Sequence, residues 1–154
     1  TVKGDSITEG NNTTNGNSNV KGDLGVEGST NLKDTTVDGK LDVTGNATIN
    51  GSSTVKGDSI TEGNSTTNGN STVKGDSTVE GSQTVKGDSI TEGNNTTNGN
   101  SNVKGDLGVE GSTNLKDTTV DGKLDVTGNA TINGSSTVKG DSITEGNNTT
   151  NGIQ

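Results

Sequence analysis

Aliphatic residues recur along this chain with a period of six. In units of six, the second place is Val, Leu or Ile in most units and Thr in the rest, while the sixth place carries the other Leu residues and both Ala residues. Alternate residues of a β-strand point to the same side. The pattern therefore predicts one short strand per unit, with these two places inward and the first and third places outward. The predicted core of the first repeat comprises Val20, Leu24, Val26, Leu32, Val37, Leu41, Val43 and Ile49.

Glycine marks the end of each predicted strand. Nearly all of the 26 Gly residues occupy the fourth place of a unit, and the exceptions are Gly25 and Gly108. Gly adopts backbone conformations with positive φ that other residues resist, so we expect a turn after each strand. The predicted turn residues of the first repeat are Gly4, Gly10, Gly16, Gly22, Gly28, Gly39, Gly45 and Gly51.

A second, longer repeat is superimposed on the first. Residues 84–154 match residues 1–71 except at Asn148, Ile153 and Gln154, so the chain divides into a unit 1–83 and an incomplete copy 84–154, with no separate globular domain. Each copy contains one five-residue unit, NLKDT, with Asp34 or Asp117 in the place of Gly. Such near-identity is typical of a modular rod extended by tandem duplication and is not typical of a catalytic domain.

The units must stack, because a six-residue unit cannot bury its own inward side chains. Stacked strands pair at a spacing of roughly 4.8 Å. The block TVKGDS-ITEGN-(N or S)-TTNG is three units long and recurs at Thr1, Thr54, Thr84 and Thr137, which favours three units per turn. We therefore predict an all-β fold, a parallel β-solenoid with three faces and about 18 residues per coil. A triple-stranded β-helix shared by three chains is the alternative.

The composition narrows the chemistry. The chain has no His, Cys, Met, Pro or aromatic residue and a net charge of −9. Without His or Cys, the usual acid–base, thiolate and soft-metal sites cannot form, so we expect no enzyme and no cofactor. The 11 Lys residues are scattered singly and Arg is absent, which argues against nucleic acid as a partner. No apolar run approaches the roughly 20 residues of a membrane span.

The low apolar content, 19% of residues, is otherwise typical of disordered chains. The strict phase of Gly and of the aliphatic residues argues against disorder here, because a disordered polar chain needs no phase. Asp5, Asp23, Asp58 and Asp76 follow the turn Gly and could line a column for Ca²⁺, but their spacing differs from that of the calcium-binding nonapeptide roll. We interpret them as solvated turn residues and expect no metal.

Several strings resemble known families. The cycle V-x-G-x-S-T resembles the hexapeptide repeat of left-handed β-helices, and VKGD and VEGS resemble bactofilin polymer-forming β-helices. The string VDGKLDVTGNATINGSSTVKGD is similar to shafts of trimeric phage tail fibres, and NSNVKG resembles the N-x-V-x-G pattern of a grass antifreeze protein. These resemblances imply a β-helical architecture more than any one function.

The leading hypothesis is a structural protein, a repetitive rod in an extracellular filament, matrix fibre or surface stalk. Its expected partners are further copies of itself, joined end to end or side by side, because uncapped strand edges template pairing. The alternatives are the shaft of a trimeric phage tail fibre or adhesin, an ice-binding solenoid, and an intracellular bactofilin-like scaffold. The leading reading places the protein outside the cell or at the cell surface.

Overall fold

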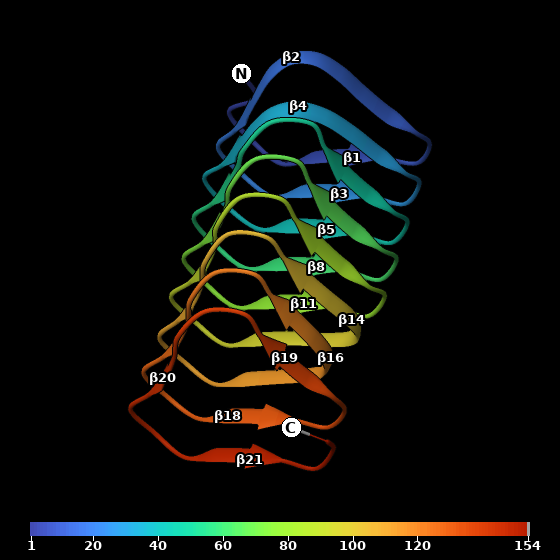
Figure 1. Ribbon diagram of the computed structural model, residues 1–154. Coiled ribbons are helices and arrows are strands. Elements are labelled where there is room, and N and C mark those ends of the chain that lie inside the picture. Colours follow the sequence, from blue (N-terminus) through green and yellow to red (C-terminus); the bar gives the residue numbers. More distant parts are fainter. Residues whose placement is uncertain (154) are drawn as a thin grey trace.

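The computed structural model describes residues 1–153 and shows a single β-solenoid. Residues 1–153 wind through about eight turns of about 18 residues, and all pairings between the 21 strands of this part are parallel (Figure 1). This confirms the predicted fold class. Residues 1–153 contain no helix, and hence none that is long and apolar enough to cross a membrane.

The strands form three ladders, which we name face A, face B and face C. Face A contains β1 (Ser6–Thr8), β3 (Leu24–Val26), β5 (Leu41–Val43), β8 (Ser59–Thr61), β11 (Ser77–Val79), the first parts of β14 (Asn95–Val103) and β16 (Thr113–Val120), β18 (Ala130–Ile132) and β21 (Asn148–Thr150). Face B contains the first parts of β2 (Asn12–Val20) and β4 (Thr30–Val37), then β6 (Ala47–Ile49), β9 (Ser65–Thr67), β12 (Gln83–Val85), the second parts of β14 and β16, and β19 (Ser136–Val138).

Face C begins with the second parts of β2 and β4, since these long strands pass round a corner of the solenoid. It continues with β7 (Ser53–Val55), β10 (Ser71–Val73), β13 (Ser89–Thr91), β15 (Leu107–Val109), β17 (Leu124–Val126) and β20 (Ser142–Thr144). Each turn therefore contributes one short strand to each face, and the three faces enclose the core.

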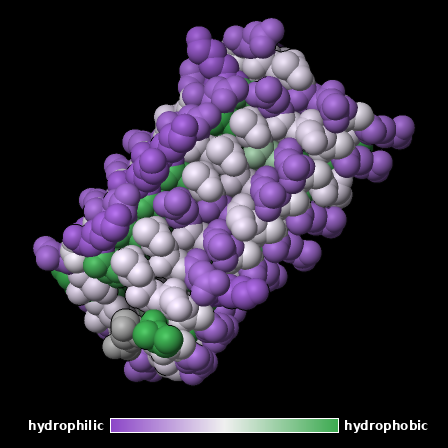
Figure 2. Space-filling model, turned by 45° about the vertical axis from the view of Figure 1, so that its right-hand side comes forward, coloured by the Kyte–Doolittle hydropathy of each residue, from purple (hydrophilic) through white to green (hydrophobic). Residues whose placement is uncertain are grey.

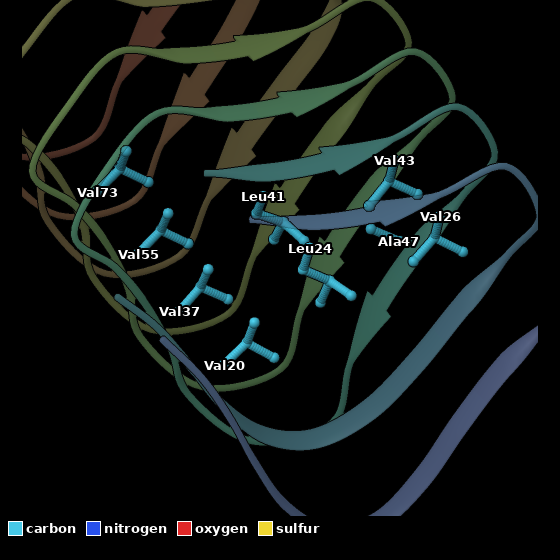
Figure 3. Close-up of a cluster of buried hydrophobic side chains, with 9 residues drawn as sticks. All are labelled: Val20, Leu24, Val26, Val37, Leu41, Val43, Ala47, Val55 and Val73. Carbon is cyan, nitrogen blue, oxygen red and sulfur yellow. The ribbon is translucent and has the colours of Figure 1, made fainter. Parts of the chain in front are cut away.

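The core consists of ladders of inward side chains along the axis, aliphatic at most places and Thr, Ser, Asn or Gln at the others. In most three-residue strands the outer two residues are buried and the middle one is half-exposed, as the period of six predicts. The structure places all eight residues of the predicted core inside, with exposed fractions between 0% and 4%. Figure 3 shows one such ladder on face C, in which Val20, Val37, Val55 and Val73 lie one above the other.

The glycines are required for a different reason from the one we expected. No glycine among residues 1–153 has a positive φ, so the turns after the strands need no left-handed backbone. Gly57 instead lies directly against the preceding turn, where a Cβ atom would be 2.6 Å from the carbonyl oxygen of Gly39. Its own N–H donates to that oxygen at 3.0 Å. Gly at the corners thus permits the close approach of successive backbones, an established use of this residue.

The same close approach governs most of the predicted turn glycines. A Cβ atom would meet the backbone of the preceding turn at Gly22, Gly28, Gly39, Gly45 and Gly51. It would meet nothing within 4 Å at Gly4, Gly10 and Gly16, which lie in the first turn described.

The five-residue unit shortens one turn without breaking the ladder. Asp34 stands at the corner where other units have Gly, and β4 continues through this corner as one strand of eight residues. Pairings across the short unit join residues 17 positions apart, for example Leu24 with Leu41, and the offset is 18 again where Thr35 pairs with Ser53. The register beyond the short turn is intact.

The second copy of the long repeat is displaced by one face. Val26 lies on face A and its counterpart Val109 lies on face C. The reason is that 83 residues make fourteen strand-and-corner units, four full turns of three units and two units over. Identical sequences therefore occupy different faces in the two copies.

Candidate functional site

The polar residues at the three corners hold successive turns together. The residue after each corner Gly is usually Asp, Asn or Ser, and its side-chain oxygen accepts the backbone N–H of the equivalent residue one turn later. Asp58 Oδ1 accepts from Asp76 N–H at 2.9 Å, and Asp76 Oδ1 accepts from Asn94 N–H at 2.8 Å. Such hydrogen bonds to a charged acceptor are stronger than neutral ones.

The same contacts bear on the column of carboxylates considered for Ca²⁺. Asp5 and Asp23 also accept a backbone N–H from the next turn, at 3.1 and 3.2 Å. Lys40 interrupts the column between Asp23 and Asp58. Within residues 1–153, no group of three or more acidic side chains could hold a metal ion.

The outward column with the most Thr residues, which bears on the ice-binding alternative, lies on face B. Its members are Thr13, Asn31, Thr48, Thr66, Thr84, Asn102, Thr119 and Thr137. The next outward column on the same face holds Asn15, Lys33, Asn50, Asn68, Lys86, Lys104, Asp121 and Lys139. Hydrophilic side chains of this kind gather in rows along the rod (Figure 2).

Gly25 and Gly108, the two glycines that do not occupy the fourth place of a six-residue unit, each leave a hollow in the outer surface. Gly25 is the middle residue of β3 on face A and points outward between Ile7 of the turn before and Asp42 of the turn after. The missing side chain leaves a hollow of about 200 Å³. It is lined by Asp5, Ser6, Ile7, Asp23, Leu24, Gly25, Lys40 and Asp42.

A second hollow lies at the corresponding place in the second copy. Gly108 points outward from β15 on face C, between Ile90 and Asp125. This hollow has a volume of about 250 Å³ and is lined by Asp88, Ile90, Asp106, Leu107, Gly108, Lys123 and Asp125. We name the two the glycine hollows. They share one sequence and face in different directions.

Packing does not require glycine at either hollow. A Cβ atom on Gly25 would have its nearest neighbour at 3.9 Å, and one on Gly108 would meet nothing within 4 Å. Both glycines also weaken a strand, because Gly in a strand interior costs roughly 0.5 to 1 kcal/mol relative to Ala. A residue that is neither needed for space nor favourable for the strand marks the hollow as a candidate functional site.

The rim of each hollow is charged. Lys40 Nζ lies 3.0 Å from Asp42 Oδ2, and Lys123 Nζ lies 2.6 Å from Asp125 Oδ2. The hydrogen bond to Asp125, supported by the charges of Asp125, Asp106 and Asp141, raises the pKa of Lys123 above its usual 10.5. The carboxylates outnumber the single Lys, so each hollow has a negative rim and an aliphatic wall, Ile7 or Ile90.

This arrangement suits contact with another surface better than bond-breaking chemistry. Ile7 and Ile90 remain 77% and 47% exposed. Each is a protruding aliphatic side chain next to a depression, a shape that a neighbouring surface can match. The sequence had already set Gly25 and Gly108 apart from the other glycines. It could not group them with Ile7 and Asp42, or with Ile90 and Asp125, which are 17 or 18 residues away and become neighbours only through the coil.

Comparisons of the chain with family models, with curated proteins and with solved structures gave no match. The resemblance to hexapeptide repeats, bactofilins and tail-fibre shafts therefore rests on the short strings of the sequence. The three-faced parallel coil itself rests on the strand pairings described above.

Proposed function

We propose that the chain is a structural rod, part of an extracellular filament, matrix fibre or surface stalk. The observation that carries the proposal is the junction between the two copies. Strand β12 (Gln83–Val85) spans this junction and pairs in register with β9 before it and with β14 after it. The duplication has therefore lengthened the coil without a defect.

What such a duplication supplies is added length of the same coil. It does not preserve the direction of any surface feature, because the second copy is turned by one face. A rod made of stacked repeats gains stability from each neighbour interface, so added copies extend it at no cost to the part already present. The polar outer columns keep its surface hydrated along the whole length.

Small-angle X-ray scattering tests the rod directly. A chain with one more 83-residue unit inserted at the junction is compared with the natural chain at about 0.5 M salt, where exposed charges are screened. Fourteen further units at roughly 4.8 Å per turn should lengthen the particle by about 22 Å and leave its cross-section unchanged. A cross-section that grows with length, or a length that does not change, would contradict the proposal.

The runner-up is the shaft of a trimeric tail fibre or adhesin, favoured by the string that resembles such shafts. In the structure each turn is closed by one chain, with pairings between residues 17 or 18 positions apart. Sedimentation equilibrium separates the two proposals, since a stable mass of three chains at all salt concentrations favours the shaft.

Antibody labelling of intact and of permeabilised producing cells tests the proposed location, and labelling only after permeabilisation favours a bactofilin-like scaffold. Thermal hysteresis would favour the ice-binding alternative.

A further inference from the structure

An outward column on face C changes its charge half-way along the rod. This column, the residues that directly follow each strand of face C, runs Lys3, Lys21, Asp38, Lys56, Lys74, Glu92, Glu110, Thr127, Glu145. We name it the edge column. Apart from Asp38, which is half-exposed, its residues are exposed. Its first half is mainly basic and its second half is acidic, apart from Thr127.

The change of sign follows from the displaced second copy. In the first copy, Lys3, Lys21, Lys56 and Lys74 follow strands of face C, whereas Glu9, Glu27 and Glu62 follow strands of face A. The second copy is turned by one face and brings the counterparts of these acidic residues onto face C. The two halves meet where Lys74 Nζ lies 3.8 Å from Glu92 Oε1.

A column that is basic in one half and acidic in the other is complementary to itself when reversed. We infer that face C is the contact surface for a second copy of this chain, antiparallel to the first, about a two-fold axis between Lys74 and Glu92. Such isologous contacts use the same patch on both partners. The axis sets Lys74 opposite Glu92 of the second copy, Lys56 opposite its Glu110, and Lys21 opposite its Glu145. Asp38 faces Thr127.

The other two outward columns of face C agree with this pairing. In the corner column that precedes the strands, the axis sets Asp34 opposite Lys123 of the second copy, and each remaining acidic residue opposite Asn or Ser. In the middle column, Thr54 lies opposite the glycine hollow at Gly108, where the missing side chain leaves room for it. No like charges face each other across the contact.

The parallel arrangement of two copies lacks this property. A two-fold axis along the rod sets the edge column against the corner column at the same height. Glu92 then faces Asp88 of the second copy, and Glu110 faces its Asp106. Like charges in direct opposition disfavour an association. On face A the residues that follow the strands include Glu9, Glu27, Glu62 and Glu80 in the first half but a single Lys, Lys116, in the second half, so face A does not complement itself in this way.

The contact is small and electrostatic. Each copy contributes a strip roughly 15 Å wide and 38 Å long, about 600 Å², at the lower end for specific interfaces. Individual exposed ion pairs contribute little and are screened by salt. The pairing should therefore be weak, reversible and strongly dependent on ionic strength.

Sedimentation velocity over a range of protein concentrations, in about 20 mM and about 500 mM salt, tests the inference. The natural chain should approach the mass of two copies at low salt and one copy at high salt. The variant E92K/E110K/E145K makes the edge column basic apart from Asp38 and Thr127 and should stay monomeric. The variant K21E/K56E/K74E makes it acidic apart from Lys3 and Thr127 and should also stay monomeric. An equimolar mixture of the two variants should form a mixed dimer.

The matched control is E9K/E27K/E62K. It changes the net charge by the same amount as E92K/E110K/E145K, but on face A. It should dimerise like the natural chain, and circular dichroism checks that every variant is folded. A natural chain that is monomeric at low salt, a mixture that does not pair, or a control that loses the dimer would overturn the inference. None of these outcomes affects the rod itself, whose length is measured at high salt.

Spin labels on cysteine substitutions read the direction of the pairing. The antiparallel axis offsets two labels on T72C by about one turn, roughly 5 Å, and two labels on T36C by about five turns, roughly 24 Å. We therefore expect a short inter-label distance for T72C and a long one for T36C. Equally short distances for both would show a parallel pair and overturn the inferred axis.

Discussion

The turn from Leu24 to Val37 and the turn from Ser59 to Val73 follow the same course and have very different interiors. The first, the apolar turn, points Leu24, Val26, Thr30, Leu32, Thr35 and Val37 inward. The second, the polar turn, points Ser59, Thr61, Ser65, Thr67, Ser71 and Val73 inward. Both are bounded by backbone hydrogen bonds of ordinary length, such as Asp38 N–H to Val20 O at 2.7 Å and Lys74 N–H to Val55 O at 2.9 Å.

The comparison separates two roles of the sequence. Backbone pairing and the corner glycines define the course of the coil, since the polar turn keeps it with a single inward aliphatic residue, Val73. Hydrocarbon adds stability where it is present, in one buried cluster with members from Val20 to Val73 and a second with members from Val85 to Ala130. A cavity of about 20 Å³ lies inside the coil at the polar turn, lined by residues between Leu41 and Gln83, which is room for a single water molecule.

Replacing a corner glycine should have the largest effect. Gly57 lies at the corner between β7 and the polar turn, and the side chain of Gly57→Val would collide with backbone atoms of Gly39. Backbone cannot give way as a side chain can, so we expect a loss of about 4 kcal/mol or more in the free energy of unfolding. Urea unfolding followed by circular dichroism measures it.

The matched control is Gly25→Ala, whose new methyl group has no neighbour closer than 3.9 Å. We expect it to be neutral or to stabilise by about 0.5 kcal/mol, because Ala is preferred to Gly in a strand. Equal losses at Gly57 and Gly25 would mean that close approach of the backbones is not the reason for the corner glycines.

The next largest effect should come from truncating an inward side chain, and the loss of stability should differ between the apolar turn and the polar turn. Leu24 and Ser59 occupy the same inward place on face A. Leu24→Ala removes a buried aliphatic side chain and should cost about 3 kcal/mol, whereas Ser59→Ala removes only a hydroxyl and should change stability by less than about 0.5 kcal/mol. Both are measured by the same unfolding experiment. Similar losses for both variants would refute the division of roles.

An apolar residue in place of a buried, unpaired polar one should stabilise the coil. Asn95 is fully buried, and neither Nδ2 nor Oδ1 has a hydrogen-bond partner in the described part of the chain. Asn95→Val removes a buried polar group that costs about 1 to 2 kcal/mol, so the midpoint of thermal unfolding should rise. The same change at Asn12, its less buried counterpart in the first copy, should have little effect. A fall in the midpoint for Asn95→Val would contradict the prediction.

The smallest effect concerns the corner ladder beside the polar turn. Asp76→Ala removes the acceptor of the Asn94 N–H, and we expect a loss of about 1 kcal/mol. Asp76→Asn keeps an acceptor and should recover most of it. Amide hydrogen exchange at Asn94 is the direct readout, and unchanged protection in Asp76→Ala would show that the hydrogen bond does not stabilise the corner.

The fold was largely predictable, because its main determinants repeat every six residues. The phase of Gly and of residues such as Val20 and Val26 predicted the stacked strand-and-turn units, and the recurring three-unit block predicted the three faces. The reason for the glycines was not predictable, since at Gly57 it depends on a contact with Gly39, one turn away. The glycine hollows and the edge column were not predicted, because they join residues that lie on the same face in successive turns. The face that a residue occupies depends on the number of units before it, the two five-residue units included.

Each turn pairs only with the turns next to it, so contacts join residues 17 or 18 positions apart wherever they lie in the chain. The entropy cost of closing a loop depends on its length, and here that length is the same for the last turn as for the first. A longer chain of this kind therefore adds folding steps without adding slower ones. Each turn can settle on the one before it while the remaining chain is still being synthesised.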